Sequence, residues 1–183
     1  MSLIKCKLFC IPTAVSLLML SASGFSADGT INFTGEFIAT TCDIQIDNGP
    51  NNSEINLGIY NIKALANVGD LTTSKMVNIS LTDCPVQNKD INLEFVAANT
   101  TSDGLTYKVT GANPISTSDI GIALFKDDAH ASQIVPASTM VPVTLTNDVG
   151  SAKIYASFKR IQNSGPLQAD KITATATFNI NYL

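Results

Sequence analysis

A strict alternation of apolar and polar residues near the C-terminus constrains the fold of this chain more than any other feature. From residue 172 to residue 182 every even position is apolar or aromatic and every odd position is Thr or Asn (ITATATFNINY). Successive side chains of a β-strand point to opposite faces, so a period of two predicts a strand with one buried face. Residues 31–37 (INFTGEF) alternate in the same way. We therefore expect a β-protein.

The rest of the chain divides into short apolar or alternating runs separated by turn-forming residues. Strands are predicted at residues 41–46, 55–60, 75–84, 91–97, 105–109, 120–125, 141–146 and 152–161. A short helical turn is predicted within residues 61–74, and a loop at 111–118. Only 14% of the residues are charged, and Thr, Asn and Ser, which favour strands and turns, take their place. Short strands at this spacing indicate a β-sandwich in one domain.

The first 27 residues have the layout of a secretory signal peptide. Lys5 and Lys7 precede an apolar run at residues 8–20, and small residues follow as far as Ala27. The apolar run is shorter than the roughly 20 residues that a membrane-spanning helix needs. We predict a mature chain that begins at Ala27 or Asp28, is exported and does not insert into a membrane.

The mature chain is acidic. Removing residues 1–27 takes away two lysines and no acidic residue, which leaves 9 basic and 15 acidic residues and a net charge of −6. A surface of this sign, without basic runs, disfavours binding to phosphate backbones. We therefore expect no nucleic-acid partner.

Two cysteines remain after the signal segment is removed, Cys42 and Cys84. In an exported chain they most simply form one disulfide, which closes a loop of about 43 residues and contributes roughly 3–5 kcal/mol in the chain-entropy model. Two free thiols are disfavoured in an oxidising compartment. A zinc site is disfavoured too, because two Cys and one His are too few ligands.

The sequence contains no pattern that would support catalysis. It has no glycine-rich phosphate loop, no HExxH and no GxSxG. The single histidine, His130, lies in a polar stretch and is expected to be a solvated loop residue. Asp127, Asp128 and Asp148 do not have EF-hand spacing and are interpreted as turn carboxylates. We predict no enzyme, no cofactor and no metal.

Five segments taken in order resemble the type 1 fimbrial subunits of the chaperone–usher pathway. They are DGTINFTGEF (28–37), TTCDI (40–44), INLG (55–58), ISLTDC (79–84) and TATFNINYL (175–183). The resemblance covers the mature chain. It implies an immunoglobulin-like β-sandwich that lacks its last strand and is completed by donor-strand exchange. It also implies a cell-surface fimbrium of a Gram-negative bacterium, and three partners: neighbouring pilin subunits, a periplasmic chaperone and an outer-membrane usher.

The resemblance also assigns roles to segments and residues. Residues 1–27 would be the signal peptide, 28–38 the N-terminal donor strand and 39–183 the pilin domain. The groove-filling residues of the donor strand would be Ile31, Phe33, Gly35 and Phe37. The last strand, which borders the groove and binds the chaperone, would contribute Phe178, Ile180, Tyr182 and Leu183. The disulfide of Cys42 and Cys84 would connect the first two core strands.

Two alternatives remain at this stage. Alternation alone does not distinguish a donated strand from a strand of a complete sandwich, and a secreted, self-complete binding module of lectin or adhesin type is the second hypothesis. The order of the matching segments favours donation. In one departure from the family, Asp170 stands where members often carry a glycine before the last strand, which leaves the start of that strand open.

Overall fold

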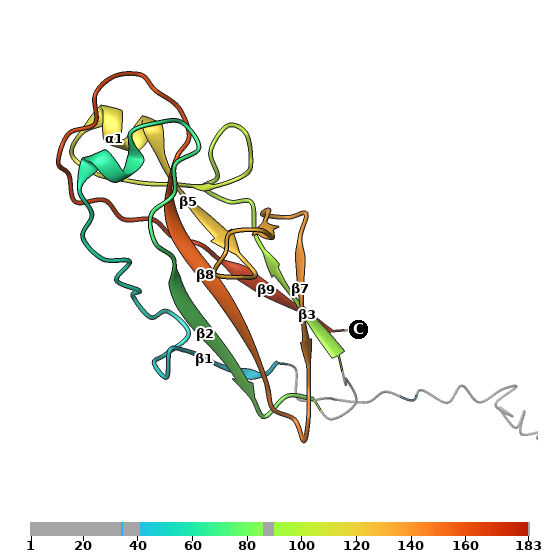
Figure 1. Ribbon diagram of the computed structural model, residues 1–183. Helices are drawn as coiled ribbons and strands as arrows, with labels where there is room; N and C mark the ends of the chain where they lie inside the picture. The colour runs from blue at the N-terminus through green and yellow to red at the C-terminus, as the bar shows by residue number, and fades with distance from the viewer. Residues whose placement is uncertain (1–33, 35–40, 86–89, 183) are drawn as a thin grey trace, which may run out of the picture. The chain divides into compact units, whose positions relative to one another are not determined.

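The computed structural model describes residues 34, 41–85 and 90–182, which form two antiparallel β-sheets and two short helices (Figure 1). In chain order the elements are β1 (Asp43–Ile46), η1 (Ile62–Leu65), β2 (Lys75–Thr82), β3 (Asp90–Phe95), β4 (Tyr107–Lys108), α1 (Pro114–Asp119), β5 (Ile120–Phe125), β6 (Gln133–Ile134), β7 (Met140–Thr144), β8 (Gly150–Arg160) and β9 (Phe178–Tyr182). No helix in this part of the chain is long and apolar enough to cross a membrane.

The two sheets combine pairs of consecutive strands with pairs of strands that are far apart in the chain. One sheet has the order β1-β2-β8-β5-β4, with β6 beside β5, and the other has the order β7-β3-β9. The chain passes between the sheets from β2 to β3, from β3 to β4, from β6 to β7, from β7 to β8 and from β8 to β9. Such crossings are typical of an immunoglobulin-like sandwich. The predicted β-sandwich is confirmed.

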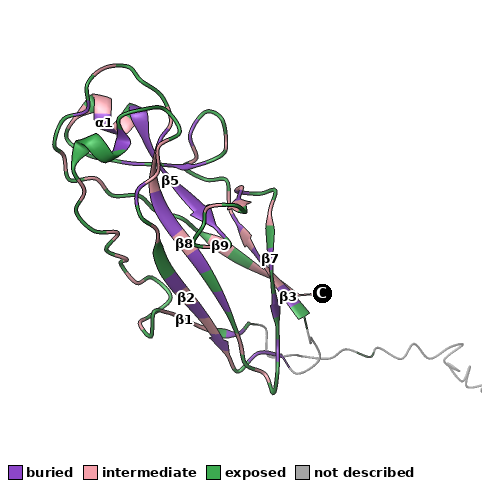
Figure 2. Ribbon diagram, viewed as in Figure 1, coloured by how far each residue is buried: buried purple, intermediate pink, exposed green. Residues whose placement is uncertain are grey.

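One hydrophobic core lies between the sheets, and alternate strand residues build it. In β3, Ile91 and Leu93 are fully buried and Phe95 is 2% exposed, whereas the residues between them reach the surface. Figure 2 shows the same alternation along β2 and β8, and β5 is buried along its whole length. Burying such a side chain contributes roughly 1.5–3 kcal/mol before the entropy cost.

A buried ion pair joins the loops at one end of the sandwich. Arg160 ends β8 and Asp119 ends α1, and Nη2 lies 2.9 Å from Oδ2, with side chains 3% and 0% exposed. Nη2 also donates to the main-chain oxygen of Gly165. Burial raises the pKa of Asp119, but hydrogen bonds from Ser164 and Ser118 outweigh it and hold the pKa below its ordinary value.

The strand predicted at residues 55–60 is absent from the structure, so this prediction was wrong. The apolar run INLGIY is interrupted because Gly58 has φ +105°, a conformation that favours glycine, and its N–H donates to Asn56 Oδ1 at 2.9 Å. Ile59 is consequently fully exposed. The segment from residue 53 to residue 61 belongs to no strand.

The prediction of a loop at residues 111–118 was also wrong, because α1 begins within this segment. Asn113 caps this helix: its Oδ1 accepts from Ile115 N at 2.9 Å, and Pro114 occupies the first turn. Both residue types are favoured at these positions. The Asn-Pro pair was the available signal. The helical turn predicted within residues 61–74 is confirmed by η1.

The last strand is shorter than its alternation predicts. Regular pairing begins at Phe178, and the preceding residues make only an isolated bridge, between Thr173 and Thr110, and one bond from Val96 N to Thr177 O. Ile172 packs against the core, but Ala174 and Ala176 are exposed, so the predicted inward face is interrupted before Phe178.

Candidate functional site

Strand β9 occupies the edge of its sheet. It pairs with β3 in a register that sets Phe178 opposite Phe95 and Ile180 opposite Leu93. No strand lies on the other edge of β9 among residues 41–85 and 90–182. An unpaired edge carries free main-chain donors and acceptors, which makes it a template for another strand.

The main-chain groups that face this free edge can be identified. Val96 N donates to Thr177 O at 2.8 Å, so Thr177 turns its main-chain groups toward β3. In an antiparallel pair this direction alternates from residue to residue. The N–H and C=O groups of Phe178, Ile180 and Tyr182 therefore point away from β3, toward the open side. These are the residues whose side chains face the core.

The side chains of the same three residues are only partly buried, although they contact the core. Their neighbours across the ladder on β3 are almost completely inaccessible. The rings of Phe178 and Phe95 pack with centroids 5.7 Å apart. On the outer face of the sheet, Asn181 Nδ2 donates to Glu94 Oε2 at 2.8 Å. The last strand thus leaves a row of apolar surface uncovered on its core side.

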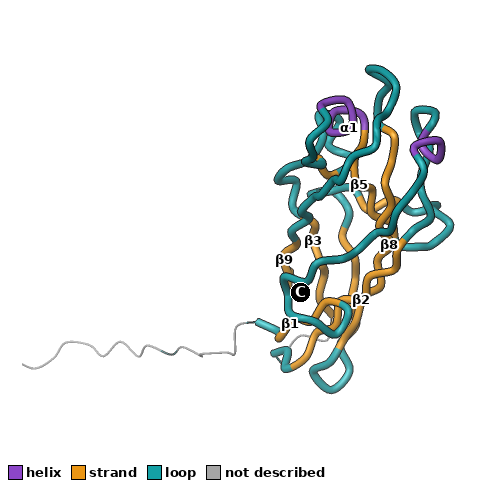
Figure 3. The backbone as a smooth tube through the Cα atoms, turned by 90° about the vertical axis from the view of Figure 1, so that its left-hand side faces the viewer, coloured by secondary structure: helices purple, strands orange, loops and turns teal. Residues whose placement is uncertain are grey.

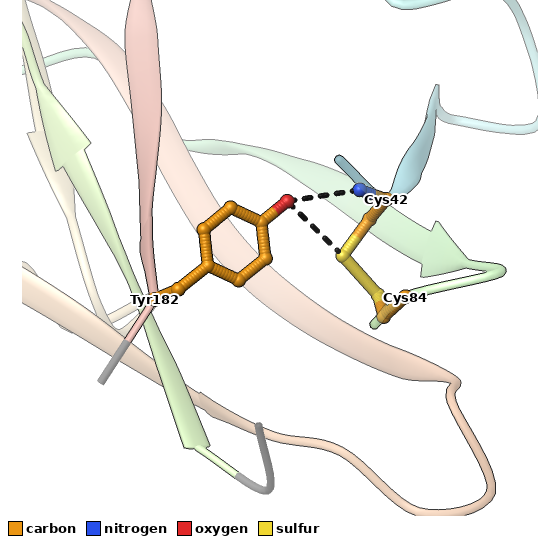
Figure 4. The surroundings of a disulfide bond; sticks show 3 residues. All are labelled: Cys42, Cys84 and Tyr182. Carbon is orange, nitrogen blue, oxygen red and sulfur yellow. Dashed lines mark hydrogen bonds between the residues drawn. A yellow bond between two sulfur atoms is a disulfide. The ribbon is translucent and has the colours of Figure 1, made fainter. Parts of the chain in front are cut away.

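The end of β9 is fastened to the beginning of β1 next to the disulfide (Figure 4). Cys42 precedes β1, Cys84 follows β2, and their sulfur atoms are bonded, which confirms the predicted pairing. Cys42 N donates to the Tyr182 hydroxyl at 2.9 Å, and that hydroxyl lies 3.8 Å from Cys42 Sγ. The edges of the two sheets are therefore in contact at this end.

The chain that follows β1 provides further half-buried apolar side chains. Ile44 and Ile46 on β1, and Ile55 and Leu57 in the unpaired segment, all pack against the core without being fully covered. β1 is the edge of its own sheet. Figure 3 shows β9 as a strand and the chain between β1 and η1 as a loop. No main-chain hydrogen bond joins residues 54–60 to β9 in the described part of the chain.

Asp170, which departs from the family pattern, has a defined structural role. Its carboxylate accepts from Asn113 N at 2.9 Å and from Ala112 N at 3.2 Å, and these bonds hold its pKa below the ordinary value. A Cβ on Gly111 would lie 2.5 Å from Asp170 Oδ2 and 2.8 Å from Ile172 Cγ2. The carboxylate therefore fixes the start of the last segment against a glycine on the neighbouring loop.

His130 is less solvated than its sequence context predicts. Its ring packs on Phe125 with centroids 4.7 Å apart, and Nε2 lies 2.9 Å from Ser157 Oγ. Asp127 accepts from Ala131 N and Ser132 N, which confirms its interpretation as a turn carboxylate. Among the described residues no group of three or more His, Cys, Asp or Glu could hold a metal ion.

The structure brings together only some of the residues that the sequence singled out. Cys42 and Cys84 meet Tyr182 at one end of the free edge, and Ile180 and Phe178 follow along the same strand. The donor residues Ile31, Phe33, Gly35 and Phe37, together with Leu183, lie outside the described residues. The Asp119–Arg160 pair and the contacts of Asp170 were missed, because single charged residues in predicted strands and loops give no periodic signal.

Comparison with known proteins identifies the family. A model of the family described as "Fimbrial protein" matches residues 31–183. Long polar fimbria protein A of Salmonella typhimurium is 28% identical over 171 residues, which cover 91% of this chain and 92% of that protein. The type-1 fimbrial protein subunit of Serratia marcescens is 26% identical over 181 residues, which cover 94% of this chain and 97% of that protein.

Solved structures agree in fold. The P pilus rod subunit PapA has a TM-score of 0.59 at 16% identity, covering 77% of this chain and 99% of that chain. A subunit in the structure of a chaperone–usher pilus has a TM-score of 0.59 at 17% identity, covering 85% of this chain and 95% of that chain. This chain belongs to the fimbrial protein family and is a structural pilin subunit, which assembles with other pilin subunits.

Proposed function

We propose that this chain is a subunit of a chaperone–usher fimbria that polymerises by donating residues 28–38 to the free edge of β9 in the next subunit. The donated segment would lie between β9 and the chain that follows β1. Residues 39–183 would form the acceptor domain, and residues 1–27 would be removed during export through the periplasm to the cell surface. The observation that carries this proposal is the unpaired edge of β9, whose core-facing side chains are only partly buried.

Two complementary patterns support the proposal. Phe178, Ile180 and Tyr182 present both free main-chain groups and exposed apolar surface on one side. The alternation of residues 31–37 supplies main-chain partners and apolar side chains at matching spacing. Burial of Ile31, Phe33 and Phe37 would stabilise the assembly by roughly 1.5–3 kcal/mol each before entropy costs.

The same edge is the expected binding site for a periplasmic chaperone before assembly. An edge strand with uncovered apolar surface is an aggregation hazard, which a temporary strand from another protein would remove. An outer-membrane usher would then exchange that strand for the donor segment of the next subunit. The relatives with fimbrial names, which come from Gram-negative bacteria, support this location and these partners.

The proposal is tested by replacing one apolar side chain of the donor strand with a charged one. Phe33→Asp in the mature chain places a charge on the predicted groove-facing side of the donor strand, and we expect loss of fibres in electron micrographs and of subunit ladders in gels. Thr34→Asp is the matched control, because it adds the same charge on the opposite face of the predicted strand.

A second arm measures docking directly. A chain that begins at residue 39 is unfolded by heat with and without a peptide of residues 28–38, and we expect the peptide to raise the midpoint by mass action. The same peptide carrying Phe33→Asp should have little effect. Fibres that survive Phe33→Asp, or a truncated chain that ignores the peptide, would contradict strand donation and leave a complete sandwich.

A further inference from the structure

The sheet that contains β9 has a second edge, formed by β7. Strand β7 pairs with β3 on one side, in a register that sets Pro142 opposite Asn92 and Met140 opposite Glu94. Among the described residues no strand covers its other side. The three-stranded sheet thus has two edges in reach of another copy, and strand addition must discriminate between them.

The hydrogen-bonding direction along β7 follows from its neighbours. Val96 N bonds to Thr177 O, and the pairs Glu94–Asn179 and Asn92–Asn181 follow this bond at every second residue of the ladder. The main-chain N–H and C=O groups of Asn92 and Glu94 therefore point toward β9 and away from β7. The opposing residues, Pro142 and Met140, accordingly turn their own main-chain groups outward, to the free edge. Ala137 N donates to Phe95 O at 2.6 Å on the β7 side of β3. Phe95 thus turns its carbonyl away from β9, as the alternation requires.

Three positions of β7 face the free edge, because Thr144, opposite Asp90, has the same phase as Met140 and Pro142. The central position and one carbonyl beside it are disabled or already engaged. Pro142 has no N–H, so the centre of the edge offers no main-chain donor. The carbonyl oxygen of Met140 accepts from Lys126 Nζ at 3.0 Å, so it is already engaged and has a positive charge beside it. Proline and lysine at sheet edges are known means of preventing edge-to-edge pairing. The core-facing β7 residues are Val141 and Val143, both buried, and they leave no uncovered row like that of β9.

We propose that Pro142 and Lys126 close the β7 edge and thereby direct strand addition to β9. Without them, β7 of one copy would pair with β7 of a second copy, giving an isologous dimer or a branched assembly. The inference rests on the proposed strand donation for its biological meaning. The closure of β7 itself is a property of one sheet edge and can be measured separately.

The test uses the mature chain carrying Phe33→Asp, so that strand donation does not contribute to association. In this background we compare no further change, Lys126→Met with Pro142→Thr, and Thr144→Val. The last is the matched control, because it raises strand propensity on the same exposed face of β7 without freeing an N–H. Sedimentation velocity reports the mass, and amide hydrogen exchange reports which strand becomes protected.

We expect the parent and the Thr144→Val chain to sediment as monomers and the doubly opened chain to double its mass or exceed that. Slowed exchange should appear in β7 and not in β9. A doubly opened chain that stays monomeric, or a parent that already pairs through β7, would overturn the inference. If the Phe33→Asp chain forms fibres while amide exchange in β7 stays fast, strand donation is refuted. The comparison among the three chains would still decide whether the β7 edge is closed.

Discussion

Replacing Asp119 by Ala tests how strongly the buried ion pair stabilises the fold. The change removes the carboxylate that faces Arg160 and that also accepts from Ser164 N at 2.8 Å. Removing one partner of a buried pair typically costs about 3–5 kcal/mol, because the remaining charge is buried without compensation. Arg160 keeps hydrogen bonds to Asn163 Oδ1 and Gly165 O, so we expect the lower end, about 3 kcal/mol.

The assay is guanidinium unfolding of the oxidised mature chain, followed by far-ultraviolet circular dichroism. Glu54→Ala is the control, since Glu54 is exposed, and a change there should stay within about 0.5 kcal/mol. Asp119→Ala combined with Arg160→Leu should cost less than the sum of the two single changes, because neither charge is then left alone. A loss below about 1 kcal/mol for Asp119→Ala, or strictly additive effects, would refute the reasoning.

The same carboxylate predicts an acid dependence. Because the pKa of Asp119 is lower in the folded protein, the unfolded chain binds this proton first as the pH falls. The free energy of unfolding should therefore be constant down to about pH 5. It should decrease as the pH falls through the pKa of Asp119 in the unfolded chain, about 3.9, toward its lower pKa in the folded protein. The Asp119→Ala chain should show a shallower acid limb, which unfolding curves at a series of pH values would reveal; an equally steep limb would exclude Asp119 as a contributor.

Three further outcomes are expected. Burial raises the pKa of Tyr107 to about 12, so the unfolded chain loses this proton first and stability should fall as the pH rises above about 10. In unfolding curves at alkaline pH, Tyr107→Phe should remove that fall. Tyr182→Phe leaves Cys42 N without its acceptor and should cost about 1–3 kcal/mol in guanidinium unfolding; an unchanged midpoint would mean that water replaces the hydroxyl. Gly111→Ala places a Cβ against Asp170 and should lower the free energy of unfolding by about 1–3 kcal/mol. The loss should be smaller in a chain that also carries Asp170→Ala, and equal losses in both backgrounds would contradict the contact.

Local patterns were sufficient to predict most of the strands. β5 coincides with the predicted run at 120–125, because a continuous apolar stretch between turns has no other stable place than a core. The alternation around Leu93 and Ile180 likewise predicted which side chains face inward. The disulfide was predicted because only two cysteines lie outside the predicted signal segment.

Features that depend on distant partners could not be predicted from such patterns. Residues 55–60 have strand-like composition, yet a single positive φ at Gly58 removes them from any ladder. Strand β3 pairs with β7 on one side and with β9 on the other, which leaves β9 at the edge of the sheet. The alternation of apolar and polar residues does not say which strands pair. Asp119 and Arg160 lie 41 residues apart, so no local pattern connects them.

The contact between Tyr182 and Cys42 has a kinetic consequence. The two residues are 140 positions apart in the chain. Until β9 arrives, one edge of β3 has no partner, and Leu93 loses part of the cover that makes it inaccessible in the finished fold. Closing so long a loop is slow, because its entropy cost precedes the contacts that repay it. A folding state that lacks β9 therefore holds most of the sandwich and still exposes part of the core, at β3, to other chains.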